Sequence, residues 1–291
     1  MLILENEQYR ICVKEIGAEL CSFFEKTTQR EFMWQPCDEI WNHSSLILFP
    51  NPGRICRCRT IIGGRVYQGY MHGFAYKKRF SVVAHTSTLL IMELYSDDET
   101  RASFPYEFTL RVVYRLTDEK LIQEFHVLNH GDKKMYFCLG AHPGFYFPIN
   151  LGESGNDYVL RFDTPQQIDR LIPHSETMLL THEKYRFLNN ETDIPLSENY
   201  FNDGAVLLEN VHAESITLMS LKSKCFIKLE IKGFPFMCLW GNKHRNAMIC
   251  VEPWCGVSDY IDTDHIWETK YGIESIFPSE EFCREIKISV G

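Results

Sequence analysis

Four short stretches of the sequence combine a side chain that can move protons or bind hydroxyls with a turn-forming Gly or Pro and nearby aromatic residues. They carry Arg54, His72, His142 and Glu252. Charged or planar polar groups hydrogen-bond sugar hydroxyls, while aromatic rings cover the C–H faces of a sugar. The residue types at these four positions therefore favour a carbohydrate site in which protons are transferred.

His142 stands in the string LGAHPGFYFP, residues 139–148, between small residues and an aromatic run. Gly and Ala before it let backbone approach a ligand, and Pro143 with Gly144 predicts a turn directly after it. The alternative is a turn histidine whose hydrogen bonds are satisfied locally. The function of His142 therefore depends on which groups from the rest of the chain meet its imidazole.

Glu252 follows the apolar run 248–251 and precedes Pro253, so we expect it to end a strand at the rim of a sheet. A carboxylate placed there against Trp254 is partly desolvated, which favours a base that can also hold a proton. The alternative is a solvated carboxylate at the end of a strand.

The remaining candidates each have an ordinary structural explanation. His72, in MHGFA, can instead cap a turn or bond to backbone. Arg54 follows the turn string PNPG, and most arginines are simply solvated. Asp203 is the least specific candidate, because its string, FNDGAV, is first of all turn chemistry.

Several reaction classes lack their sequence signatures. The chain has no GxxxxGKS or GxGxxG phosphate loop and no GxSxG elbow, which argues against nucleotide use and serine hydrolase chemistry. A metal held by His72, His142 and Glu252 is conceivable, but no HExxH helix supports it, so we predict no metal. The pairs Cys56/Cys58 and Cys250/Cys255 also lack the two-residue spacing that commonly holds zinc.

The elements that must position these residues read as strands. A hairpin-like opening covers 9–26, and the only helical structure expected is short turns, such as those near 38–41 and 182–187. Polar connections are expected at 152–156 and 189–202. Nothing alternates strand and helix as a parallel sheet requires, so we predict an all-β fold, a large antiparallel β-sandwich forming a single domain over 1–291. Further strands are expected at 80–83, 89–95, 108–117, 121–128, 136–139, 158–162, 205–208, 215–219, 226–231, 236–240, 248–251 and 285–290.

Composition narrows the partners. The 291 residues carry a net charge of −9 with Lys and Arg scattered, which argues against a nucleic-acid or membrane surface. The chain shows neither a signal peptide nor a spanning segment at its start or later, so we expect a cytoplasmic protein. Eleven cysteines in that setting are expected to be reduced and mostly buried. A small neutral or mildly charged ligand fits this chain best.

Three motifs in order, HGFA at 72–75, GAHPGF at 140–145 and VEPWCG at 251–256, resemble the aldose 1-epimerase (galactose mutarotase-like) superfamily, most closely its LacX-like branch. The FPNPGR string that ends at Arg54 and the KYGI string at 270–273 extend the resemblance over nearly the whole chain. The resemblance implies a large antiparallel β-sandwich with a sugar site on its concave face.

The resemblance also implies roles for individual residues. Glu252 matches the catalytic base and His142 the general acid, while His72, Arg54 and Asp203 match sugar-binding positions. Two features depart from the family. HGFA is continued by Tyr-Lys (76–77) where Arg-Asp is usual, so the His72 loop is expected to be braced differently. The NHSYFN-type string of the long-form galactose mutarotases is absent, so galactose specificity does not transfer.

The expected function is mutarotation of an aldose without a cofactor, by a monomer or homodimer. Two alternatives remain open. A sugar pocket that has lost turnover would make the chain a carbohydrate-binding domain, although both acid and base stand in motif context here. A hexose-6-phosphate 1-epimerase would use the basic residues near two of the motifs, which are Arg57, Arg59, Arg65, Lys77, Lys78 and Arg79.

Overall fold

The computed structural model describes residues 1–242 and 247–291, and antiparallel strands dominate it. The largest sheet is open and does not close into a barrel. Its strands, in order across the sheet, are β5 (Ser45–Leu48), β13 (Leu139–Tyr146), β20 (Met248–Cys255), β19 (Phe236–Gly241), β16 (Val206–Glu209), β14 (Tyr158–Pro173), β17 (Ser215–Ser220), β18 (Phe226–Glu230), β22 (Glu281–Val290), β11 (Leu121–Asn129), β10 (Phe108–Leu116), β9 (Leu89–Tyr95) and β8 (Ser81–His85), with β15 (Leu180–Pro195) paired to β14.

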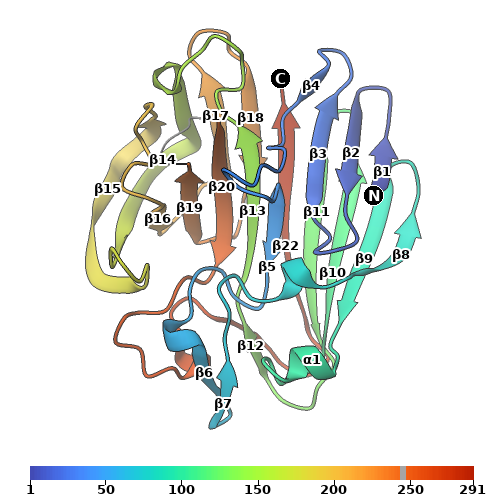
Figure 1. Ribbon diagram of the computed structural model, residues 1–291, viewed down its shortest axis with the longest axis vertical. Coiled ribbons are helices and arrows are strands. Elements are labelled where there is room, and N and C mark those ends of the chain that lie inside the picture. The colour runs from blue at the N-terminus through green and yellow to red at the C-terminus, as the bar shows by residue number, and fades with distance from the viewer. Residues whose placement is uncertain (243–246) are drawn as a thin grey trace.

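Smaller elements complete the chain, several of them below the sheet ends in Figure 1. A second sheet contains β1 (Leu2–Glu5), β2 (Tyr9–Val13), β3 (Leu20–Glu25) and β4 (Arg30–Glu31). Two short ribbons pair β6 (Arg59–Ile62) with β7 (Arg65–Gln68) and β12 (Met135–Phe137) with β21 (Glu274–Ile276). The helical turns are α1 (Asp98–Arg101), η1 (Cys56–Cys58), η2 (Ala75–Lys77), η3 (Gly155–Asp157) and η4 (Trp267–Thr269).

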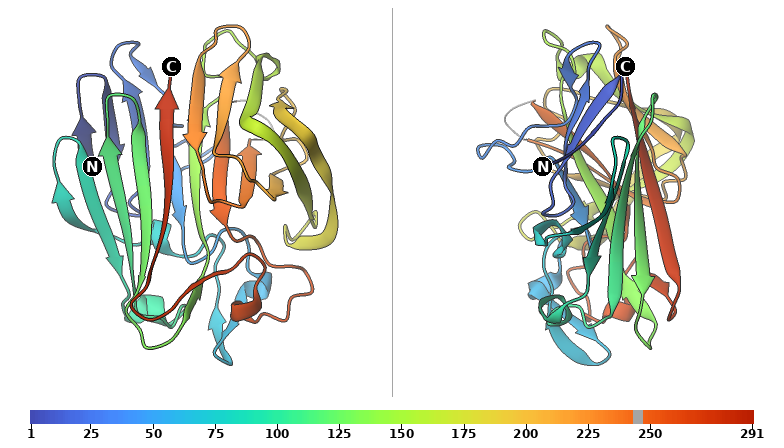
Figure 2. Two further views of the ribbon diagram at one scale, coloured as in Figure 1. Left: turned by 180° about the vertical axis from the view of Figure 1, so that it is seen from behind. Right: turned by 90° about the vertical axis from the view of Figure 1, so that its right-hand side faces the viewer.

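The sheets form two layers around one main core, as the edge-on view in Figure 2 shows. The inward residues of β1–β3 and of β10, β11 and β22 belong to the same buried cluster. The Tyr114 hydroxyl crosses this core to donate to the Ala18 carbonyl at 2.7 Å. A β-bridge between Met33 and Phe145 joins the segment after β4 to β13. The predicted all-β sandwich is confirmed, and its core fixes the strands that carry the site.

Strand β14 lets the large sheet pass from one layer to the other. Residues 158–162 pair with β17, residues 169–171 pair with β16, and the register against β15 shifts between them. A strand with such irregularities bends, so the two halves of β14 can serve two layers. No helix of the described residues is long and apolar enough to cross a membrane.

Three local predictions were wrong. Residues 182–187 are extended within β15, because they pair with β14 instead of closing a helical turn. Residues 38–40 form a turn closed by the Cys37–Trp41 bridge, and no helix begins there. The predicted connection 189–202 is also partly wrong, because β15 continues to Pro195. In each case pairing with a distant or flanking segment outweighs local propensity.

The string around His142 is a strand, and the turn predicted at Pro143-Gly144 is wrong. β13 runs through both residues. Its pairing with β20 is interrupted after Gly140 and resumes at Gly144. The section not paired with β20 contains Pro143, which has no N–H to donate. Glu252 likewise lies inside β20, not at a strand end as predicted.

Candidate active site

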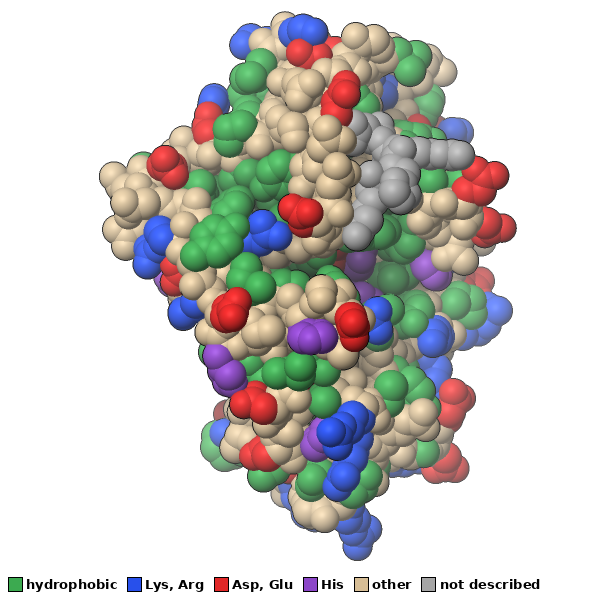
Figure 3. All heavy atoms as spheres, turned by 60° about the vertical axis from the view of Figure 1, so that its left-hand side comes forward, with side chains coloured by type: hydrophobic (Ala, Val, Ile, Leu, Met, Phe, Trp, Pro, Cys, Tyr) green, Lys and Arg blue, Asp and Glu red, His purple; other side chains and the backbone are tan. Residues whose placement is uncertain are grey.

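A cavity of about 440 Å³ opens on the face of β5, β13, β20 and β19 that is turned away from the main core. Figure 3 shows the hollow from outside, with histidine and hydrophobic side chains within it. Side chains alternate along a strand, so Ala141 and Val251 enter the core while His142 and Glu252 line the cavity. The predicted site residues Arg54, His72 and Trp254 line the same cavity.

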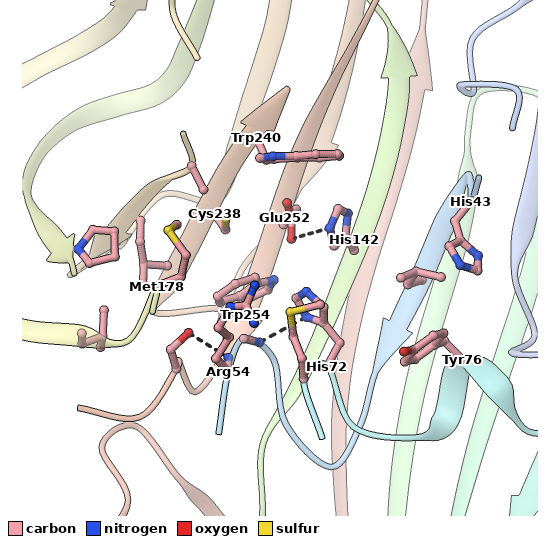
Figure 4. Close-up of a pocket in the computed structure, with 18 of the residues that line it drawn as sticks. His43, Arg54, His72, Tyr76, His142, Met178, Cys238, Trp240, Glu252 and Trp254 are labelled. Carbon is pink, nitrogen blue, oxygen red and sulfur yellow. Dashed lines mark hydrogen bonds and ion pairs between the residues drawn. The ribbon is translucent and has the colours of Figure 1, made fainter. Parts of the chain in front are cut away.

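His142 and Glu252 face each other across two adjacent strands (Figure 4). Gly140 pairs with Trp254 and Gly144 pairs with Cys250, so the shared register sets His142 opposite Glu252. Directly opposite residues of an antiparallel pair have the closest side chains. The His142 Nε2 lies 3.4 Å from the Glu252 Oε2. The two groups that the sequence motifs single out are therefore neighbours at the cavity floor.

Glu252 is buried without a compensating donor. It is 1% exposed, and neither carboxylate oxygen has a hydrogen-bond partner among the described residues. Burial raises the pKa of Glu252 well above its usual range, and the nearby Cys238 thiol and Trp254 indole oppose only part of that rise. Such a carboxyl group can hold a proton near neutral pH and can accept one when a substrate approaches.

His142 is enclosed by aromatic rings. Its imidazole stacks on Trp41 at a centroid distance of 4.7 Å and meets the edge of Trp240 at 6.0 Å. Its Nδ1 has no hydrogen-bond partner in the described parts of the chain. Burial lowers the pKa of His142 well below its usual value, and the neighbouring His72 lowers it further. Both members of the pair are thus biased toward their uncharged forms while the cavity is empty.

His72 is held as a hydrogen-bond donor toward the cavity. Its φ of 61° lies in the left-handed region, and its backbone N–H donates to the Gly53 carbonyl at 2.9 Å. The Gly53 N–H in turn donates to the His72 Nδ1 at 3.2 Å, so the ring proton belongs on Nε2. Burial, with Arg54 nearby, lowers the pKa of His72 to about 4. The ring centroids of His72 and His142 are 5.6 Å apart.

Arg54 is fixed through its backbone, and its side chain enters the cavity. Its N–H donates to the Ser258 hydroxyl at 3.0 Å, and its carbonyl accepts from the Asp259 N–H at 2.9 Å. No carboxylate of residues 1–242 and 247–291 forms an ion pair with its guanidinium. The Trp254 ring lies beside it (Figure 4) and meets His72 at 6.1 Å. A guanidinium next to an indole suits a polyhydroxylated ligand.

The structure does not bring Asp203 to this cavity. Asp203 lies exposed in the turn before β16, whereas Ala205 and Leu207 line the wall. Tyr76, at the position where the sequence departs from the family pattern, does line the cavity. Sequence reasoning missed His43 as a site residue, although the string WNHSS places it just before a strand and near Trp41.

Among the described residues, one cluster of side chains brings possible metal-ligating atoms close together. The donor atoms of His142, Cys250 and Glu252 all lie within 4.8 Å of one another. Burial, with Glu252 nearby, raises the pKa of the Cys250 thiol well above its usual value, which disfavours the thiolate that a metal needs. The absence of a resident metal stays a prediction.

The chain is similar to proteins of known family. The family profile described as "Aldose 1-epimerase" matches residues 1–264. The chromosomal LacX protein of Lactococcus lactis subsp. lactis is 30% identical over 99% of this chain and 98% of its own length. The galactose mutarotase related enzyme of Lactobacillus acidophilus superposes with a TM-score of 0.93 at 30% identity, covering 99% of this chain and 96% of its own. A galactose mutarotase-like protein of Lactobacillus casei gives a TM-score of 0.93 at 28% identity, with complete coverage of both chains.

Proposed function

Because the chain belongs to the aldose 1-epimerase family, we propose that it interconverts the α and β anomers of an aldose by acid/base opening and closing of the sugar ring. One observation carries the proposal: the His142 Nε2 stands 3.4 Å from the Glu252 Oε2 at the floor of a cavity that fits a monosaccharide. When a base and an acid lie this close together, they can act on two oxygens that are bonded to the same anomeric carbon.

In the proposed reaction Glu252 removes the proton from the anomeric hydroxyl while His142 protonates the ring oxygen. The bond between the anomeric carbon and the ring oxygen breaks, and the open-chain aldehyde forms. Rotation about the C1–C2 bond turns the other face of the aldehyde toward the ring oxygen. The two side chains then return the protons as the ring closes. No electron or group is transferred overall, so two proton-exchanging side chains suffice without a cofactor.

The protonation state of the pair follows from its burial. Burial raises the pKa of Glu252 and lowers the pKa of His142, so the empty cavity favours a protonated carboxyl beside a neutral imidazole. Transfer of that one proton across the 3.4 Å contact gives a carboxylate base and an imidazolium acid. In this proposal the pair itself holds the one proton that the reaction needs.

The other cavity groups would hold the sugar. His72 donates from Nε2, Arg54 offers its guanidinium, and the Trp254 ring gives a flat apolar surface for C–H groups. In this assignment these three residues bind substrate and do not transfer protons.

Charge favours a free aldose over a hexose phosphate. Of the basic residues near the motifs, Lys78 is paired with Asp97 at 3.3 Å and Arg79 is paired with Glu15. Among the described residues, Arg54 is the one Lys or Arg that lines the cavity. A phosphate clamp normally combines several cationic donors.

Polarimetry of the purified chain on freshly dissolved single anomers tests the proposal, with a panel of free aldoses and their 6-phosphates. We expect faster mutarotation than in protein-free buffer for at least one free aldose. A preference for a 6-phosphate would support the phosphate alternative. No acceleration for any sugar, with sugar binding detected by calorimetry, would instead show a carbohydrate-binding domain.

A further inference from the structure

A third histidine, His43, lines the cavity beside the catalytic pair. Its ring lies 6.0 Å from that of Trp41 and 5.9 Å from that of Tyr76. Figure 4 shows His43 and Tyr76 at the side of the cavity beyond His142, away from Glu252. In the proposed reaction the anomeric oxygen contacts Glu252 and the ring oxygen contacts His142, so the His43 side of the cavity is the one next to the ring oxygen.

A buried carboxylate stands behind His43. Glu19 is 5% exposed, and its Oε1 lies 3.7 Å from the His43 Nδ1. The same carboxylate accepts from the Ser44 N–H at 2.6 Å and is paired with the Lys14 Nζ at 2.8 Å. Burial alone would raise the pKa of Glu19, but the nearby His43 ring and the hydrogen bonds from Lys14 and Ser44 outweigh burial and lower the pKa to about 2. Glu19 is therefore an ionised carboxylate behind His43, paired with Lys14 and outside the cavity lining.

This charge sets the orientation and tautomer of His43. At 3.7 Å the attraction is electrostatic, being longer than a direct hydrogen bond, and it favours the ring proton on Nδ1. The Nε2 of His43 makes no hydrogen bond within residues 1–242 and 247–291, so it is left as an acceptor. His72 is held the opposite way, with its Nδ1 occupied by the Gly53 N–H and its Nε2 as the donor.

We propose that His43 binds a sugar hydroxyl at this end of the cavity through Nε2, and that Glu19 is the positioning residue that orients it. The inference rests on the proposed epimerase function and deepens it by assigning a specificity subsite. The ligand is a neutral hydroxyl, not a phosphate, because among the described residues no Lys or Arg lines the cavity beside His43 to clamp an anion.

The first test pairs deletion of the side chain with deletion of the hydroxyl. His43→Ala should raise KM for the best aldose about tenfold, the usual size for one lost hydrogen bond, with kcat changed less than threefold. A series of 2-, 3-, 4- and 6-deoxy analogues should include one that lacks the hydroxyl bound by His43. For that analogue the wild type and His43→Ala should have the same KM. His43→Gln, which keeps a hydrogen-bonding group, should recover part of the loss. An unchanged KM in His43→Ala, or a tenfold deficit that persists on every deoxy analogue, would overturn the proposal.

The second test isolates the role of Glu19. In ¹⁵N NMR spectra, wild-type His43 should be mainly the Nδ1–H tautomer, and Glu19→Gln should shift it toward Nε2–H and raise KM less than His43→Ala does. Lys14→Gln is the matched control, because it removes the cationic partner of Glu19 at a position outside the cavity lining, and it should leave KM and the His43 tautomer unchanged. An Nε2–H tautomer in the wild type would contradict the assignment.

The readouts separate this inference from the proposed function. If no sugar mutarotates, the epimerase proposal fails, and calorimetric Kd replaces KM in the same comparison of variants and deoxy analogues. The tautomer measurement needs no turnover.

Discussion

Two neighbouring regions of the molecule each bury a carboxylate, but they satisfy it differently. Asp259, in the segment beneath Arg54, is 6% exposed, is paired with the buried Lys270, and accepts the Cys56 N–H at 2.9 Å. Glu252, at the cavity floor, is 1% exposed and has no hydrogen-bond donor, Lys or Arg of this kind among the described residues. A buried carboxyl group without such partners is costly to ionise, so a fold keeps such a group where its chemistry is used.

Other buried carboxylates resemble Asp259. Glu209 is paired with Lys184 at 2.7 Å, and Glu93 is paired with Arg111 at 2.6 Å. Burial alone therefore does not mark the site. Among the described residues, Glu252 differs in having the His142 imidazole and no Lys or Arg beside it. The following predictions test whether that difference separates catalysis from stability.

The largest effect is expected at Glu252. Glu252→Gln should lower the mutarotation rate by about 10²- to 10⁴-fold, the usual contribution of a general base. Its stability should not fall. Because the folded-state pKa is raised, Glu252 costs stability as pH rises above the unfolded value of 4.5, and the neutral amide removes that cost. Polarimetry and urea denaturation at several pH values measure both quantities. A variant that keeps its activity, or that loses stability increasingly with pH, would break the distinction.

The opposite result is expected at Asp259. Asp259→Asn leaves the buried Lys270 ammonium unpaired, which should cost about 3–5 kcal/mol of unfolding free energy. The mutarotation kcat should stay within tenfold of the wild type, since the pair does not line the cavity. Asp262→Asn is the control, because the ion pair of Asp262 with His182 is exposed. This variant should change the unfolding free energy by less than about 0.5 kcal/mol. Equal losses in the two variants would show that burial of the ion pair has no consequence.

An intermediate effect is expected at His72 in acid. Its pKa is about 4 in the folded state against 6.5 ordinarily, so folding stability is lost as pH falls from 6.5 toward 4. This difference corresponds to about 3 kcal/mol below pH 4. His72→Gln should therefore lose less stability than the wild type between pH 7.5 and pH 4.5 in urea denaturation. Parallel losses in the two proteins would show that His72 takes up its proton freely while folded.

The smallest effect is expected at Asp203. Its side chain is exposed and lies outside the cavity, so Asp203→Ala should change KM less than twofold and stability by less than about 0.5 kcal/mol. Steady-state polarimetry provides the measurement. A tenfold rise in KM would restore Asp203 as the hydroxyl-binding aspartate that the resemblance implies.

Much of the fold follows from local pattern. The two-residue alternation places the strand Leu89–Tyr95 at its observed bounds and β10 within one residue. The motifs also identify His142 and Glu252, although both were assigned to strand ends and turns. Their strands, β13 and β20, run through the motif residues because ladder pairing with neighbours outweighs the local effect of Pro and Gly.

What local pattern leaves open is which distant residues meet. The register that sets His142 opposite Glu252 depends on the order of strands in the large sheet, which no local string contains. His43 has no motif of its own, since its significance comes from Glu19 in the β2–β3 connection and from the cavity that the fold builds beside it.

The most direct test of the acid/base pair is a double-mutant polarimetric measurement on the sugar that the wild type turns over best. His142→Asn and Glu252→Gln should each reduce the rate by about 10²- to 10⁴-fold. Because the two groups act together in the same ring-opening step, the double variant should be no slower than the slower single variant, within a few fold. Mutarotation near the wild-type rate in either single variant, or losses that multiply in the double variant, would contradict a coupled catalytic pair.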